Sequence, residues 1–271
     1  MVKTTEQRRS REAPPRTRPK PRILEVARTE QLSPNMLRVV LTGDELSGWP
    51  PGSDGANIKI GIPDPGWSSD DLRARMEQGP RPVIRTYTAR RFDVDRNELA
   101  VDFVLHGDVG IAASWASRAR RGAPLAVAGP SGLKLPTRDA DWYLVYADMS
   151  AMPAAEAALE SLPPTTRGHV IFDVLSAADR RAIAVPENMT LTWLINTHPE
   201  TPSTEQLDCV KSLSWPDGRA SVFVAGEAGV VRKFRTWLLD EKNVAKADAY
   251  ISGYWKVGLV EEQYQADKRA S

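Results

Sequence analysis

The chain has 271 residues, which suits one large domain or two of ordinary size and is ample for a buried core. Its apolar share of 41% is ordinary for a globular protein, and its net charge of +1 excludes a global field that would draw it to nucleic acid or to a membrane. A single cysteine, Cys209, excludes intramolecular disulfides and argues against a cysteine-based metal cluster, so we expect a small buried residue on a helix.

Residues 1–22 form a basic, proline-rich segment with 8 lysines and arginines against 2 glutamates. Because this segment has almost no apolar residues to bury, we expect a disordered tail, with a nucleic-acid-binding arm as the less favoured alternative. It lacks the apolar core of a secretory signal, and no stretch of the chain is apolar for long enough to span a bilayer. From these absences we expect a cytoplasmic protein without a nucleic-acid partner or a membrane span.

Residues 23–138 have the pattern of a β-domain. Apolar side chains alternate along two of its segments, as a sheet with one buried face requires, and a helix is expected near residues 111–120. Glycine and proline mark the turns between the segments. Several short strands separated by turns favour a small β-barrel or β-sandwich. The expected strands are residues 36–41, 57–62, 85–88, 99–105 and 125–128.

Residues 139–271 instead alternate strands with helices, which predicts a parallel α/β sheet. Such sheets bind ligands outside the carboxyl ends of their strands, here at residues 147–150, 225–227 and 253–255. A barrel followed by this kind of sheet suggests one domain for a cofactor and another for a second nucleotide. The expected strands are residues 142–146, 169–175, 191–195, 221–225 and 249–252, and the expected helices are residues 154–162, 177–183, 204–213 and 230–242.

The most informative motif, Arg-x-Tyr-Thr, is formed by Arg85, Tyr87 and Thr88, and we include Thr86 in the same site. A guanidinium can pair with a phosphate in bidentate fashion, a tyrosine has a flat apolar face, and a threonine hydroxyl can hydrogen-bond the flavin atom that receives hydride. The motif resembles the flavin motif of the ferredoxin-reductase-like superfamily. That resemblance implies that these residues bind FAD. The alternative is a basic edge strand with solvated charges.

A second motif, His-Gly-x-x-Gly-x-Ala, follows an expected strand within residues 101–115. Its glycines permit a tight turn close to a ligand, and the helix that follows presents free N–H groups to a phosphate. The segment resembles a motif of the siderophore-interacting protein family. The alternative for its histidine is a packing role. The flavin contacts that this resemblance implies are His106, Gly107, Gly110, Ala112, Ala113 and Ser114.

Three further segments resemble motifs of the same family, in the same order along the chain. They are the turn at Asp148, Ser150 and Ala151, the strand end at Glu227, and the segment at Tyr254 and Trp255. Ala147 stands where the family has glycine. The resemblance covers about residues 23–265 and is strongest to NADPH-dependent ferric-chelate reductases. It implies a ferredoxin-reductase-like fold with an FAD-binding antiparallel barrel over residues 23–138 and an NAD(P)H-binding α/β domain over residues 139–271.

The same resemblance implies electron transfer from NADPH, or NADH, through FAD to the Fe(III) of a siderophore. Ferric catecholates carry several negative charges, so the substrate site beside the flavin is expected to be basic. Lys59 and Lys256 match two basic positions of the family, and together with Thr88 they are the expected catalytic residues. At a third position Ser131 replaces arginine, and Lys134 is close enough in sequence to substitute for it. Solvated surface lysines are the alternative.

Other assignments remain open. Arg180 and Arg181 follow the second α/β strand, where the 2′-phosphate of NADPH needs a basic group, although exposed helix charges are an equal alternative. With 3 scattered histidines we expect no protein-bound metal, and we expect a monomer. Competing functions are a ferredoxin-dependent reductase, a non-enzymatic binder of ferric siderophore or flavin, and a reductase that supplies free reduced flavin.

Overall fold

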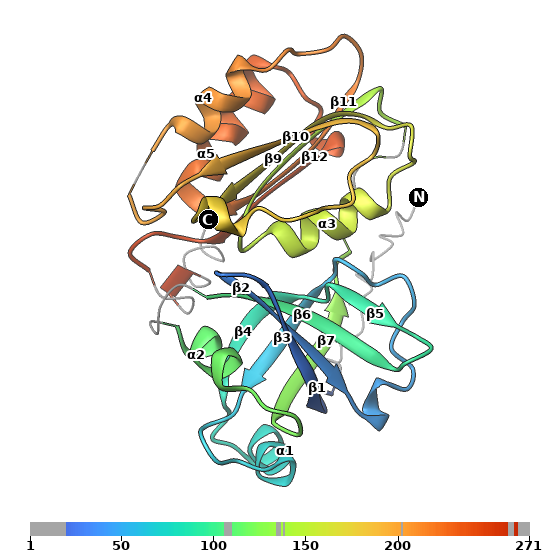
Figure 1. Cartoon of the computed structure of the whole chain (residues 1–271), viewed down its shortest axis with the longest axis vertical. Coiled ribbons are helices and arrows are strands. Elements are labelled where there is room, and N and C mark those ends of the chain that lie inside the picture. The colour runs from blue at the N-terminus through green and yellow to red at the C-terminus, as the bar shows by residue number, and fades with distance from the viewer. Residues whose placement is uncertain are drawn as a thin grey trace, which may run out of the picture.

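The computed structural model describes residues 20–105, 110–133, 137, 139–201, 203–259 and 263–264. Its strands form two sheets, which Figure 1 shows one above the other with the amino-terminal sheet below. Residues 1–19 of the expected tail lie outside the described residues, as do three expected site residues, His106, Gly107 and Lys134.

The first sheet has seven strands in the order β4-β3-β7-β1-β2-β6-β5, and all its neighbouring strands pair antiparallel. The sheet curls, so that β4 at one edge also contacts β6. The predicted antiparallel character of this half is therefore confirmed. The elements are β1 (Arg22–Ser33), β2 (Met36–Thr42), β3 (Asn57–Ile62), β4 (Val83–Thr88), β5 (Arg91–Asp93), β6 (Glu98–Val104), β7 (Pro124–Ser131), α1 (Ser69–Gln78), α2 (Ile111–Arg118) and the short 3-10 helix η1 (Asp44–Leu46).

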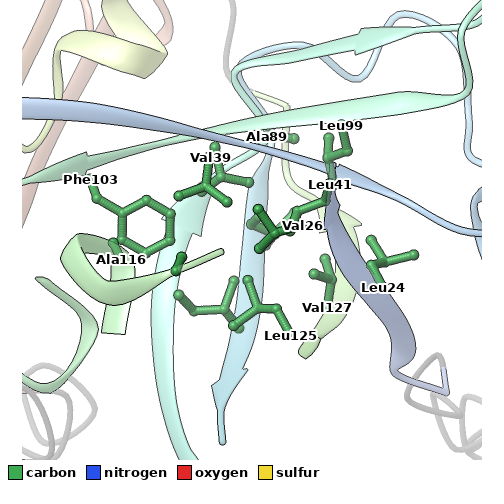
Figure 2. Close-up of a cluster of buried hydrophobic side chains, with 14 of the residues drawn as sticks. Leu24, Val26, Val39, Leu41, Ala89, Leu99, Phe103, Ala116, Leu125 and Val127 are labelled. Atoms are coloured by element: carbon green, nitrogen blue, oxygen red, sulfur yellow. The ribbon is translucent and has the colours of Figure 1, made fainter. Parts of the chain in front are cut away.

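The alternating side chains of these strands meet inside the curled sheet. Figure 2 shows Val26, Val39, Leu41 and Phe103 pointing toward one another, with Ala116 of α2 beside the phenyl ring. Phe103 is 0% exposed, as are Leu41 and Val39. Each large apolar side chain buried in this way stabilises the fold by roughly 1.5–3 kcal/mol, so the inner face of the sheet is a full hydrophobic core.

The sequence prediction lacks several elements of this half, among them β1, β5 and α1. Strand β1 alternates only over its first residues, where Leu24 and Val26 are buried, and its polar second half is held by pairing with β2. Helix α1 is too polar for an apolar stripe, because among its described residues only Leu72 is buried. Its start carries a capping box in which Ser68 and Asp71 bond each other's backbone N–H, and that sequence signal could have located the helix.

The second sheet has five parallel strands in the order β10-β9-β8-β11-β12, which confirms the predicted parallel α/β arrangement. Helix α3 covers one face, and α4 and α5 cover the other (Figure 1). No helix in the described part of the chain is long and apolar enough to cross a membrane. The elements are β8 (Trp142–Asp148), α3 (Met152–Glu160), β9 (Arg167–Val174), β10 (Asn188–Ile195), α4 (Glu205–Ser212), β11 (Ala220–Glu227), α5 (Ala228–Thr236) and β12 (Ala249–Trp255).

The helix expected over residues 177–183 is wrong: only a 3-10 turn, η2 (Ala177–Asp179), forms there. The Asp179 carboxylate accepts hydrogen bonds from Ser33 Oγ at 2.7 Å and from the backbone N and the Nδ2 of Asn35 at 2.9 and 2.8 Å. These bonds to the turn between β1 and β2 replace the helical bonds that local propensity favours. A tertiary contact therefore decides the local structure of this segment.

Helix α3 faces the amino-terminal sheet and joins the two halves (Figure 1). Glu156 on α3 is 3% exposed and is paired with Arg181 and with Arg90, which leads from β4 to β5 and also pairs with Glu160. Gly55 lies so close to α3 that an added Cβ would be 3.0 Å from the Ala157 methyl. Buried ion pairs and close packing thus fix the position of one sheet relative to the other.

Candidate functional site

A cavity of about 1060 Å³ lies where the two sheets meet. Strand β4, the start of α2 and the carboxyl ends of β8, β9, β11 and β12 line it, and its volume is sufficient for a dinucleotide. Lys59, Ser114, Ala151 and Lys256 are not part of its described lining. The expected site residues that do line it are Arg85, Thr86, Tyr87, Thr88, Gly110, Ala112, Ala113, Asp148, Ser150, Glu227, Tyr254 and Trp255.

The end of β4 forms one wall of the cavity. Strand β4 lies at the edge of its sheet, with β3 as its neighbour. The Tyr87 ring packs against Phe103 with centroids 4.5 Å apart, and Thr88 is 4% exposed at the base of the wall. Thr86 pairs in register with Lys59 of β3, whose Nζ donates to the Thr86 hydroxyl. Lys59 therefore lies directly beside a residue of the wall.

The start of α2 adds backbone donors to the same cavity. Its N-cap is Gly110, and no described side chain caps its first turn. The first N–H groups of an α-helix have no acceptor within the helix, and the helix dipole makes that end attractive to anions. Gly110, Ala112 and Ala113 line the cavity at this end. The wall therefore offers an arginine, Arg85, and a helix start, which together suit a pyrophosphate.

Asp148, at the carboxyl end of β8, uses its carboxylate within the protein. Its Oδ1 accepts from the Ser150 N and Oγ at 2.9 and 2.6 Å, and its Oδ2 accepts from Trp255 Nε1 at 2.7 Å. Gly226 passes so close that a Cβ there would lie 2.5 Å from Oδ2, and its φ of 146° lies in the region that favours glycine. Burial raises the pKa of Asp148, and the bonds from Ser150 and Trp255 oppose that rise.

Glu227 uses its carboxylate in a similar way. Its Oε2 accepts from Val230 N at 2.9 Å and so caps α5, while its Oε1 accepts from Val257 N at 3.2 Å. Together with Asp148, it holds the segment on both sides of Lys256, whose carbonyl oxygen accepts from Leu259 N at 3.2 Å. Asp148 and Glu227, both predicted to contact a cofactor, thus lie at the cavity. Their hydrogen bonds position the turn that carries Lys256.

A buried polar cluster at the end of β9 was not predicted. The Oδ2 of Asp173 accepts from Tyr146 Oη and from Gln206 Nε2, both at 3.1 Å. Burial, followed by repulsion from Asp148, raises the pKa of Asp173 to about 6. Asp173, Asn196 and Gln206 all line the cavity. The rule that ligands bind beyond the carboxyl ends of parallel strands would have identified Asp173.

The remaining predicted residues lie elsewhere. Arg181 is paired with Glu156 on α3, and Arg180 ends the η2 turn, so neither is part of the cavity lining. Ser131 Oγ donates to the Asn57 carbonyl at 3.3 Å. Cys209 is half-buried on α4, where burial raises its thiol pKa. Among the described residues, no group of three or more histidines, cysteines or carboxylates is placed to hold a metal ion.

Two family models match the two halves of the chain. Residues 25–134 match "Siderophore-interacting FAD-binding domain" and residues 140–258 match "Siderophore-interacting protein". The ferric vibriobactin reductase ViuB of Vibrio cholerae is 35% identical over 257 residues, which is 92% of this chain and 94% of ViuB. The NADPH-dependent ferric-chelate reductase of Escherichia coli is 30% identical over 246 residues, which is 86% of this chain and 92% of that protein.

Solved structures agree with these matches. The siderophore-interacting protein SipS of Aeromonas hydrophila superposes with a TM-score of 0.81 at 32% identity, covering 93% of this chain and 98% of that one. The ferredoxin reductase of carbazole 1,9a-dioxygenase, at 16% identity and a TM-score of 0.60, shares the fold alone, and this confirms the predicted ferredoxin-reductase-like class. The chain belongs to the siderophore-interacting protein family.

Proposed function

We propose that this protein is a ferric siderophore reductase that carries electrons from NADPH through FAD to chelated Fe(III). The observation that carries the proposal is the single cavity in which the Arg85–Thr88 wall meets the strand ends at Asp148 and Glu227. A protein that only bound a chelate would not need a second wall suited to a nucleotide. The names of its relatives, ferric vibriobactin reductase and NADPH-dependent ferric-chelate reductase, support the same activity.

The barrel wall is the proposed place of FAD. Bound flavin supplies the conversion of a two-electron hydride donor into one-electron steps. Arg85 and the start of α2 would hold the pyrophosphate, Tyr87 would offer its ring to the flavin or ribityl chain, and Thr88 would offer a hydroxyl to hydrogen-bond the flavin. Because the Tyr87 ring packs on Phe103 and Thr88 is buried, both groups are already oriented before a ligand arrives.

Lys59 and Lys256 are the proposed contacts for the siderophore. A lysine ammonium attracts the negative charge of a ferric catecholate. Lys59 lies beside Thr86 of the cavity wall, and Lys256 lies on the turn that Asp148 and Glu227 hold. Replacing both lysines by alanine is expected to raise the KM for a ferric catecholate about tenfold, which corresponds to ~1.4 kcal/mol, with FAD still bound. Replacing the exposed Lys211 and Lys246 together is the control with the same loss of charge.

The experiment for the overall activity is anaerobic capture of Fe(II). Protein, FAD, NADPH and a ferric catecholate are mixed with a dye that binds only ferrous iron. Colour is expected only when all components are present. If FAD is bound and NADPH gives no Fe(II), the proposed donor is wrong. Reduced ferredoxin added in place of NADPH then tests the ferredoxin-dependent alternative.

A further inference from the structure

The α/β side of the cavity is rich in negative charge. Asp148, Asp173, Glu200 and Glu227 all line it. Among the described lining residues the cations are Arg85, on the barrel wall, and Lys233, on α5. An anionic ligand on the α/β side therefore needs Lys233 to offset these carboxylates.

Lys233 on α5 contacts the loop that leads into α4. Its Nζ donates to the Ser203 carbonyl oxygen at 2.7 Å. Ser203 lies three residues before Gln206, whose Nε2 donates to the buried carboxylate of Asp173. All of these residues line the same cavity: Asp173, Ser203, Gln206 and Lys233. The lysine ammonium thus lies next to the loop that leads into α4, the helix that carries Gln206.

Gln206 has an acceptor that the protein does not satisfy. The residue is 3% exposed, and its Oε1 has no hydrogen-bond partner among the described residues. A buried acceptor without a donor is unfavourable, by about 1–3 kcal/mol. Gln206 also lines the cavity, so its unsatisfied oxygen is a candidate acceptor for a ligand bound there. The group that fits is a hydrogen-bond donor such as a hydroxyl, because an amide oxygen can only accept.

A ribose that bears a phosphate combines the two required features. Its hydroxyl groups donate hydrogen bonds, and its phosphate needs a cation. We propose that Lys233 pairs with the 2′-phosphate that distinguishes NADPH from NADH, and that Gln206 Oε1 accepts a hydroxyl of the same ribose. This inference rests on the proposed function, because it assigns the donor of that reaction to particular residues.

The assignment replaces the one that the sequence suggested. Arg181 is paired with Glu156 on α3, and α3 covers the sheet face opposite to α4 and α5. Arg180 does not line the cavity. Lys233 lies on α5, far in sequence from the second strand, after which the sequence pattern predicted the basic residue. In the folded chain, Lys233 on α5 contacts the loop at Ser203.

The test measures nucleotide binding by calorimetry on the FAD-loaded protein, using NADP⁺ and NAD⁺. Lys233→Met is expected to weaken NADP⁺ binding about tenfold or more and to leave NAD⁺ binding unchanged within twofold. Lys233→Arg is expected to retain most of the preference, since it keeps the charge. Arg232→Met is the matched control, because Arg232 is the exposed neighbour on α5 and does not line the cavity.

Gln206→Leu tests the second contact. It removes the acceptor at similar size, and we expect it to weaken NADP⁺ and NAD⁺ binding by the same factor, about fivefold. An unchanged ratio of the two affinities in Lys233→Met would overturn the lysine assignment, and unchanged affinity for both nucleotides in Gln206→Leu would overturn the glutamine assignment. A thermal unfolding curve for each variant separates loss of a contact from loss of the fold.

The outcome is separable from that of the proposed function. If wild-type protein binds neither nucleotide while it still reduces a ferric siderophore with ferredoxin, the donor of the proposed function is wrong. If NADP⁺ binds and its preference over NAD⁺ is insensitive to Lys233, the proposed function survives and this inference is contradicted.

Discussion

The two walls of the cavity use their sequence motifs differently. On the barrel wall, the Arg-x-Tyr-Thr residues Arg85, Tyr87 and Thr88 line the cavity themselves. On the α/β wall, the motif carboxylates of Asp148 and Glu227 accept hydrogen bonds from nearby side chains and backbone. A motif can therefore supply the side chains of a cavity wall in one half of a protein and hold the geometry of a loop in the other.

The difference has a physical reason. Strand β4 is at the edge of its sheet, paired with β3, and the side chains of Arg85–Thr88 line the cavity. Strands β8 and β11 end in turns and helix starts, whose backbone N–H groups need acceptors. The nearest carboxylates supply them: Asp148 at the turn after β8, and Glu227 at the start of α5.

The largest expected effect concerns the contact that keeps the two walls facing each other. Glu156→Gln leaves the buried side chain of Arg90 and the partly buried side chain of Arg181 without their shared negative partner. We expect the free energy of unfolding to fall by about 3 kcal/mol, measured by urea denaturation. Glu160→Gln is the control, because Glu160 is largely exposed and is expected to lose less than about 1 kcal/mol. Equal losses in the two variants would contradict the role given to Glu156.

The barrel wall is tested by Arg85→Ala. Loss of a charge-assisted contact to the pyrophosphate is expected to weaken FAD binding about 100-fold, measured by titrating apoprotein with FAD and following flavin fluorescence. Arg91→Ala, on β5, the next strand along the chain, and outside the cavity lining, is the matched control and is expected to bind FAD normally. If Arg85→Ala retains FAD as tightly as the control, the motif does not contact the cofactor.

The α/β wall is tested by Asp148→Asn. An asparagine has one acceptor oxygen where the carboxylate has two, so it cannot serve both Ser150 and Trp255. We expect a loss of about 2 kcal/mol in unfolding free energy and a raised KM for the ferric siderophore, with FAD retained. The comparison of the two walls therefore predicts that KM rises while FAD binding is unchanged. If Asp148→Asn loses FAD and keeps the KM of the wild type, the comparison of the two walls is contradicted.

The smallest expected effect is a pH dependence at Asp173. Its pKa in the folded protein is about 6, above that of an unfolded aspartate at about 4, so protonation stabilises the fold. The stabilisation of the fold by protonated Asp173 is fully present below about pH 4 and is lost as the pH rises through 6. Relative to Asp173→Asn, the wild type is therefore expected to lose about 1–2 kcal/mol of unfolding free energy between pH 4 and 7. Parallel pH profiles for the two proteins would contradict the raised pKa.

Much of the fold follows from local patterns. Alternating apolar residues identified β3 and β6, and the continuous run that begins at Trp142 identified β8. The expected helix over residues 177–183 is wrong because Asp179 is bonded to Ser33 and Asn35, which are remote in sequence. No window of local sequence contains that information. Helix α1 is different, since its capping box at Ser68 was present in the sequence.

The candidate site likewise contains residues that local sequence identified and residues that only the fold brings together. Residue types and spacing identified Arg85, Tyr87 and Thr88, because their chemistry is local to one strand. The cluster of Asp173, Gln206 and Lys233 combines β9, α4 and α5, so only the folded chain brings it together. The bond from Trp255 to Asp148 links residues 107 apart, and no spacing rule indicates it.

The most direct measurement of the central claim is anaerobic stopped-flow absorbance of the FAD-loaded protein in two steps. Addition of NADPH is expected to bleach the flavin band, and subsequent addition of a ferric catecholate is expected to restore it while Fe(II) appears. Both steps should occur in each turnover. A flavin band that NADPH leaves unchanged, or a bleached band that ferric siderophore does not restore, would contradict the proposal that one cavity joins the two reactions.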